Sequence, residues 1–230
     1  MQIPPFLPLL PLLLPTTTAH PLLLPPRDAA PADAPDALPR ISSISYSGTG
    51  CPSSSPGVDR TGSSWADLAF RMNGLEAVIP VPSTSTVPSP YTSTANCQVH
   101  VQVAAAGAAP GWQVGLRDVA VRGRAVLDPG AALEYYVTSF WSQDAGATTT
   151  VRGTLSNTGA ARLDADVTVL ATVPDDRVAW SPCAAAGPDD GAPLGLLNVN
   201  FRVALLADGG RYAFFGRAPT ESWGYVWRRC

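Results

Sequence analysis

A strand rhythm across residues 111–141 constrains the fold of this chain more than any other feature. In GWQVGLRDVAVRGRAVLDPGAALEYYVTSFW, apolar and polar residues alternate with a period of two, as in a β-strand with one buried face. The alternation slips by one residue between Leu116 and Val119, which indicates a β-bulge. The DPG segment at 128–130 predicts a tight turn, because proline fixes φ and glycine accepts positive φ. The stretch therefore predicts a bulged antiparallel hairpin, and it names no chemistry.

Other segments repeat this period-two pattern and are separated by turn residues. No long segment shows the 3.6-residue period of an amphipathic helix. Roughly ten short strands with turns between them are typical of a β-sandwich or jelly roll. We therefore expect an all-β fold, an antiparallel β-sandwich that resembles a jelly roll. The other expected strands are 76–81, 97–103, 150–155, 163–173, 196–206, 212–215 and 223–227, with loops at 53–64 and 82–95 and an undecided segment at 65–72.

The first 40 residues differ in composition from the rest of the chain and contain 11 of its 24 prolines. Residues 1–19 combine a short leucine-rich run with a small residue suited to cleavage, which predicts a signal peptide. This run is too short and too often broken by proline to span a membrane. Residues 20–40 are rich in Pro and Ala, which predicts a disordered linker or pro-segment. We expect residues 41–230 to form a single β-sandwich domain.

Composition excludes several classes of function. All 15 basic residues are arginine, so Schiff-base chemistry on a lysine and a lysine-dependent phosphate loop are excluded. The net charge of -3 gives no reason to expect a nucleic-acid partner. Of the two histidines, only His100 lies in the expected domain, and its place in QVHVQV puts it on the polar side of a strand. The sequence also lacks the common nucleophile, metalloprotease and dinucleotide motifs.

The four cysteines predict two disulfides, because an even count behind a signal-like segment is typical of secreted proteins. Three connectivities are possible, and sequence alone does not choose among them. We favour Cys51–Cys97 with Cys183–Cys230, and each pair then closes a loop of about 45 residues within one half of the chain. In the chain-entropy model each such loop stabilises the fold by about 4 kcal/mol. A zinc site is disfavoured by the absence of a paired CxxC spacing.

A series of short motifs occurs in the order found in one secreted, mainly fungal family. They are GTGCP, NCQVHVQ, GWQ followed by a VAVRG strand, SPC, LNVNF and the terminal WRRC. Over about residues 44–230 the chain thus resembles the family of domains of unknown function 4360 (DUF4360). The resemblance implies secretion, two cystines and a β-rich domain, and it implies no activity.

Carboxylates supply the candidates for catalysis. Glu134, beside two tyrosines, is the best candidate for the general acid of a glycoside hydrolase, but the sequence names no second carboxylate for it. Asp164 and Asp166 share one polar strand face, where they would hold a cation or face solvent, and we favour solvent. We therefore expect neither a metal nor another cofactor.

Two rows of side chains are candidates for binding. The first row is aromatic, and if its strand face is exposed it forms a platform on which sugars stack. The alternative is burial in the core, which is favoured because the residues that alternate with this row are less apolar. The second is a polar row opposite a wholly apolar face, suited to carbohydrate or to a protein loop. The rows are Trp223, Tyr225 and Trp227, and Asn198, Asn200 and Arg202.

These observations favour a secreted, non-catalytic protein, extracellular or associated with the cell wall. It would bind a cell-wall or host surface component, either a polysaccharide or an extracellular protein. One alternative is a carbohydrate-active hydrolase that uses Asp and Glu, and another is a structural wall protein. We expect a monomer that binds neither nucleic acid nor membrane.

Overall fold

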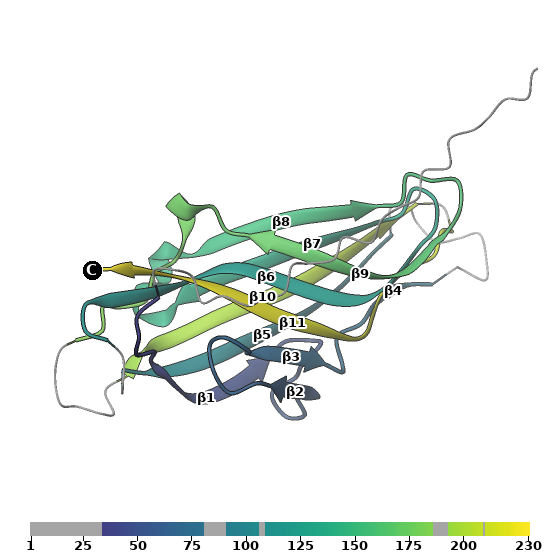
Figure 1. Cartoon of the computed structure of the whole chain (residues 1–230). Helices are drawn as coiled ribbons and strands as arrows, with labels where there is room; N and C mark the ends of the chain where they lie inside the picture. The colour runs from purple at the N-terminus through teal and green to yellow at the C-terminus, as the bar shows by residue number, and fades with distance from the viewer. Residues whose placement is uncertain (1–33, 81–90, 106–108, 186–192, 209) are drawn as a thin grey trace, which may run out of the picture.

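The chain folds into two antiparallel β-sheets packed face to face, as Figure 1 shows. The computed structural model describes residues 34–80, 91–105, 109–185, 193–208 and 210–230. The expected signal peptide and most of the expected linker lie outside these residues. The strands of both sheets lie roughly along the long axis of the molecule and pair antiparallel within each sheet. The prediction of an antiparallel β-sandwich is confirmed.

The first sheet has five strands and the second has six. The five-stranded sheet has the order β1 (Arg40–Ser47), β5 (Tyr91–Ala104), β10 (Pro193–Ala207), β7 (Ala132–Trp141) and β8 (Thr149–Ser156). The six-stranded sheet has the order β2 (Val58–Thr61), β3 (Ala69–Met72), β11 (Ala213–Arg229), β6 (Trp112–Leu127) and β9 (Leu163–Thr172), and β4 (Ala77–Ile79) pairs with β11.

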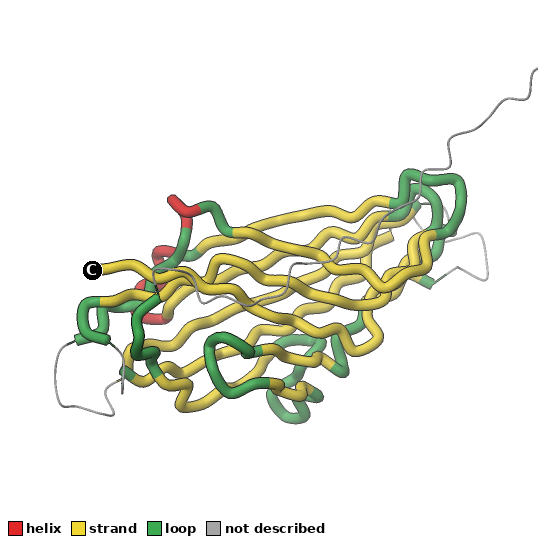
Figure 2. The backbone as a smooth tube through the Cα atoms, in the orientation of Figure 1, coloured by secondary structure: helices red, strands yellow, loops and turns green. Residues whose placement is uncertain are grey.

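Helix is confined to two short 3₁₀ segments among the described residues, drawn red in Figure 2. They are η1 (Ser142–Ala147) and η2 (Asp175–Arg177). Neither they nor any other described segment forms a helix long and apolar enough to cross a membrane.

The bulge lies where the alternation predicts it, but the expected hairpin is wrong, because the turn after β6 leads the chain into the other sheet and β6 does not pair with β7. On β11, Gly224 pairs with Asp118 and the next residue, Tyr225, pairs with Leu116, so Arg117 is the extra residue of a bulge in β6. The turn after β6 also forms as expected, with Gly130 at a φ of 81°. The one-residue slip in the sequence therefore marks a bulge that keeps both halves of β6 facing the core.

Three expectations about loops and strand ends are wrong. The expected loop at 53–64 contains β2, a short edge strand with mostly exposed side chains that give no apolar signal. β5 begins at Tyr91, inside the expected loop at 82–95, because β10 continues to pair with it there. The expected strands 212–215 and 223–227 are parts of one long strand, β11, which continues through an irregular segment at 217–219.

The core lies between the sheets and is built from the alternate residues of each long strand. Its largest fully buried side chains include Trp141, Trp223, Phe70 and Phe201. Both expected disulfides are present: Cys51–Cys97 is fully buried, whereas Cys183–Cys230 is exposed at the C-terminus. Pro35 and Pro39, just before β1, are also buried, and Trp65 Nε1 donates to the Pro39 carbonyl at 2.6 Å.

Candidate functional site

The outer face of the five-stranded sheet gathers polar side chains from four neighbouring strands. We call it the amide face. Strand alternation directs these side chains away from the core. On β5, β7 and β10 they alternate with buried residues, and those of β8 pair with outward-facing residues of β7. The face consists of Asn96, Gln98 and His100 of β5, Asn198, Asn200 and Arg202 of β10, Tyr136, Thr138 and Phe140 of β7, and Thr150 and Arg152 of β8.

Asn198 holds the amide face together rather than facing solvent, for it is only 3% exposed. Its Nδ2 donates to Ser142 Oγ at 2.9 Å and to the Leu196 carbonyl at 3.2 Å, so both amide protons are used. Its Oδ1 accepts from Nδ1 of His100 at 2.6 Å. Asn198 therefore acts as a structural crosslink and has no donor left for a ligand.

His100 belongs to the same chain of hydrogen bonds. Because the amide oxygen of Asn198 can only accept, Nδ1 of His100 carries the proton and Nε2 accepts from Ser47 Oγ at 2.8 Å. The expectation of a solvated strand histidine is thus refined: the ring is half-buried and both nitrogens are engaged. Among the described residues no carboxylate is hydrogen-bonded to the ring, so these residues form no Ser-His-Asp arrangement around it.

Asn200 leaves hydrogen-bonding capacity open at the centre of the amide face. Its Oδ1 accepts from Asn96 Nδ2 at 3.3 Å, while its own Nδ2 has no partner among the described residues. Gln98, its neighbour on β5, likewise makes no side-chain hydrogen bond within the described part of the chain. On the other side, Thr138 and Thr150 share a hydrogen bond of 2.9 Å across β7 and β8. The centre of the face thus offers amides and hydroxyls to a polar ligand.

Tyr136 is one of the two aromatic residues of the face and lies next to Asn200 and Thr138. The guanidinium of Arg202 lies 5.5 Å from the centre of its ring, and that of Arg152 lies 5.6 Å from it. Tyr136 Oη donates to Glu134 Oε2 at 2.6 Å, and Arg152 forms an ion pair with the same carboxylate. These four side chains form a charged, aromatic border along the amide face.

The environment of Glu134 does not fit the general acid of a hydrolase. The hydrogen bond from Tyr136 and the nearby Arg152 lower the pKa of Glu134 from its ordinary value. A carboxyl group that donates a proton near neutral pH needs a raised pKa instead. Glu134 is therefore ionised and positions Tyr136 and Arg152.

The aromatic row of β11 faces the core rather than solvent. Trp223 is 1% exposed, and Tyr225 and Trp227 pack partly buried against the core. Trp65 covers this pair, with its ring centre 4.7 Å from that of Tyr225 and 6.0 Å from that of Trp227. The row therefore offers no stacking platform, and its side chains serve the packing of the sandwich.

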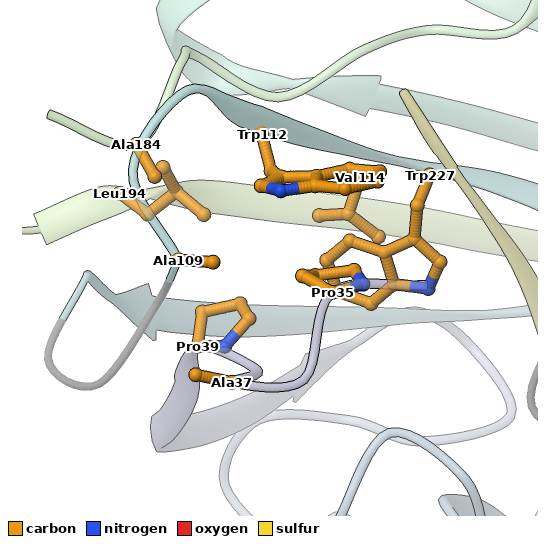
Figure 3. Close-up of a pocket in the computed structure, with 9 residues that line it drawn as sticks. All are labelled: Pro35, Ala37, Pro39, Ala109, Trp112, Val114, Ala184, Leu194 and Trp227. Atoms are coloured by element: carbon orange, nitrogen blue, oxygen red, sulfur yellow. The ribbon is translucent and has the colours of Figure 1, made fainter. Parts of the chain in front are cut away.

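Trp227 also lines the apolar pocket drawn in Figure 3, together with Trp112 and the segment that precedes β1. Pro35 and Pro39 lie across this pocket and reduce it to about 10 Å³. That volume holds at most one water molecule, so it is a packing gap rather than a site for a sugar.

Asp164 and Asp166 are engaged with an arginine. Arg124 lies 2.7 Å from Asp164 Oδ1 and 3.7 Å from Asp166 Oδ1, and both carboxylates remain about half exposed. No cluster of three or more metal-ligating residues occurs among the described residues.

Glu221 is a residue that the sequence reasoning missed. Its side chain is 0% exposed, Oε1 accepts from Trp223 Nε1 at 2.5 Å, and Oε2 has no partner among the described residues. Burial raises its pKa to about 7. A signal was present, because Glu221 lies in phase with Trp223 and Tyr225 and so shares their face. Because it is sealed in the core, it cannot touch a substrate.

Comparisons with known proteins locate the chain in one family. The sequence has no match among curated proteins. One similar solved structure is TmCBM61 in complex with beta-1,4-galactotriose, with 11% identity and a TM-score of 0.22 over 83% of this chain and 91% of that one. Another is described as the structural basis for the promiscuous specificity of carbohydrate-binding modules from the β-sandwich superfamily. It has 11% identity and a TM-score of 0.27 over 80% of this chain and 56% of that one. Scores this low carry no functional inference. The family described as domain of unknown function (DUF4360) matches residues 37–230, and the chain therefore belongs to it.

Proposed function

We propose that this protein is a secreted, non-catalytic binding module whose amide face binds a neutral polysaccharide of the cell wall. The observation that carries the proposal is the open hydrogen-bonding capacity at the centre of this face, at Asn200 and Gln98. Amides both donate and accept, which suits sugar hydroxyls that do the same. The face spans several parallel rows of side chains, which suits an extended chain of sugars more than one small molecule.

Aromatic residues support the same ligand. Tyr136 and Phe140 lie on β7 in the row next to Arg202 and Asn198, and both are half-buried. The apolar C–H faces of a sugar pack against aromatic rings while its hydroxyls reach the neighbouring polar groups. Arg202 and Arg152 already stack on Tyr136, which holds its ring in place before a ligand arrives.

Among the described residues, neither of the two glutamates with a shifted pKa suits the hydrolase alternative. Glu134 has a lowered pKa, and Glu221, whose pKa is raised, is fully buried. Glycoside hydrolysis needs both groups beside the same scissile bond. We therefore favour binding without catalysis.

Two features support an extracellular location. The two disulfides fit an oxidising compartment, and the N-terminal residues have the composition of a secretory leader. Cell-wall association follows from the proposed polysaccharide ligand. A monomer suffices for this function, because one chain supplies the whole amide face.

Retention on insoluble polysaccharides tests the proposal. Purified protein is incubated with chitin, β-glucan and cellulose, and both bound protein and released reducing sugar are measured. We expect saturable retention on at least one polymer without sugar release. Asn200→Ala should weaken this binding by about tenfold, because it removes hydrogen bonds from the centre of the face.

Asn73→Ala is the matched control, since Asn73 is an exposed amide that bonds to Asp59 in the other sheet. It should bind as the unaltered protein does. Release of reducing sugar would instead support the hydrolase. Retention that does not saturate would support a structural wall protein, and no retention on any polymer would leave an extracellular protein as the partner.

A further inference from the structure

The outer face of the six-stranded sheet, on the opposite side of the molecule from the amide face, is interrupted where β11 meets β6. Gly216 pairs with Arg124 and Thr220 pairs with Arg122, so three residues of β11, 217–219, lie opposite the single residue Gly123. Figure 1 shows these two strands side by side near the middle of their sheet. The segment is therefore a bulge in a central strand that is larger than the usual two residues opposite one.

The backbone of this bulge is held in an unusual conformation. Arg217 has a φ of 66° and Ala218 a φ of 55°, and they are the two described non-glycine residues with positive φ. Such a conformation costs on the order of 1–3 kcal/mol per residue, persists only where the surroundings impose it, and gathers at functional sites. Here the bulge is held from the core side of the sheet, because Pro219 is buried and packs against Gly123, beside the ring of Phe215.

Beside the bulge lies an open hollow of about 300 Å³, which we call the arginine hollow. Three of its residues carry a guanidinium group. Arg124 is paired with Asp164 and Asp166, but Arg122 and Arg217 have no ion pair and no side-chain hydrogen bond within the described residues. The hollow is lined by Arg122, Gly123, Arg124, Asp166, Arg217, Ala218 and Thr220.

We propose that the arginine hollow binds a uronic acid residue of an acidic polysaccharide. A guanidinium presents a planar fork of N–H donors that matches a carboxylate, and it keeps its charge at any physiological pH. Arg122 and Arg217 have this capacity free and border the same hollow, so they bind the uronate carboxylate. The rigid bulge fixes the backbone of Arg217 in advance, which reduces the entropy lost on binding.

The other lining groups favour a sugar acid over a bare anion. Asp166 and Thr220 accept hydrogen bonds, so they suit the hydroxyl groups of a sugar ring next to its carboxylate. For an inorganic anion or a nucleic-acid backbone, Asp166 is repulsive.

Isothermal titration calorimetry on the full chain at low salt tests this site with three probes. They are trigalacturonic acid, its neutral counterpart galactotriose, and sodium sulfate. We expect the unaltered protein to bind trigalacturonic acid, and the double variant Arg122→Gln/Arg217→Gln to bind it at least tenfold more weakly. Asp166→Ala should weaken the binding of trigalacturonic acid, because it removes an acceptor for the sugar hydroxyl groups. The same change should strengthen the binding of sulfate, because it removes a negative charge.

Arg40→Gln is the matched control, since it makes the same change in charge per residue at an exposed position of β1 in the other sheet. It should leave affinity unchanged, as should Asn200→Ala on the amide face, and thermal unfolding verifies that all variants fold. No binding of trigalacturonic acid, or equal loss in Arg40→Gln, would overturn the proposal. Stronger binding of both anions to Asp166→Ala would reveal a plain anion site and would overturn the assignment to a uronate.

Discussion

Two glutamates show how far the environment of a single residue sets its chemistry. Glu134 lies at the border of the amide face, where Tyr136 and Arg152 stabilise its charged form. Glu221 lies in the core, where the indole of Trp223 is its one side-chain partner among the described residues and the charged form is disfavoured. Near neutral pH the first is a fixed negative charge and the second is partly protonated.

The burial of Glu221 predicts an unusual dependence of stability on pH. Its pKa is about 7 in the folded protein against an ordinary value of 4.5, so the folded state binds more protons between these values. The stabilisation is fully present below pH 4.5 and is lost as the pH rises to 7, on the order of 3 kcal/mol. Urea unfolding at a series of pH values measures this fall in the free energy of unfolding.

Glu221→Gln supplies the control, because glutamine does not titrate. Its free energy of unfolding should be nearly flat between pH 4.5 and 7, whatever its absolute value. Carboxyls with lowered pKa values, such as Asp128 beside Arg162, act below this range and reduce stability only as the pH falls further. Parallel pH profiles for the two proteins would contradict the assignment.

At the scale of the strand, the bulge in β11 predicts opposite effects for two identical substitutions. Ala218→Gly should raise the free energy of unfolding by about 1 kcal/mol, because glycine adopts a positive φ without the steric cost of a Cβ. Ala120→Gly in β6, at a regular strand position opposite Ser222, should lower it by about 0.5–1 kcal/mol. Chemical denaturation of both variants checks the signs, and destabilisation by both would contradict the strained backbone.

The two bulges also mark how much of the fold the sequence can predict. The bulge at Arg117 shifts the apolar alternation within one continuous pattern, so it is visible in the sequence. The bulge at 217–219 contains Arg-Ala-Pro between two apolar runs, which has the composition of a turn and therefore suggests two strands. That β11 continues depends on its pairing with β6 on both sides of the bulge, which is a long-range contact.

The candidate site likewise has one part that the local sequence predicts and another that depends on long-range pairing. The polar row of Asn198, Asn200 and Arg202 is predictable, because it alternates with a wholly apolar row on the same strand. The rest of the amide face is not, because sequence does not reveal that β10 lies between β5 and β7. The aromatic row of β11 was equally visible, but whether a strand face points inward depends on the second sheet, which covers it.

At the scale of the whole molecule, the two disulfides close loops of nearly equal length in very different surroundings. Their sequence separations are 46 and 47 residues, so chain entropy assigns each about 4 kcal/mol and does not distinguish them. Cys51 and Cys97 are 0% exposed and belong to the core, whereas Cys183 and Cys230 are exposed where β11 ends.

Dithiothreitol should therefore reduce Cys183–Cys230 first, because a thiolate must reach the sulfur that it attacks. Alkylation of native protein at rising dithiothreitol concentrations, followed by peptide mass spectrometry, gives the order of reduction. The double variant Cys51→Ala/Cys97→Ala should also lose more stability than Cys183→Ala/Cys230→Ala, since it adds a cavity in the core to the same loss of loop constraint. Equal losses would mean that loop closure alone determines what each disulfide contributes, and that the sandwich absorbs the buried cavity by repacking around it.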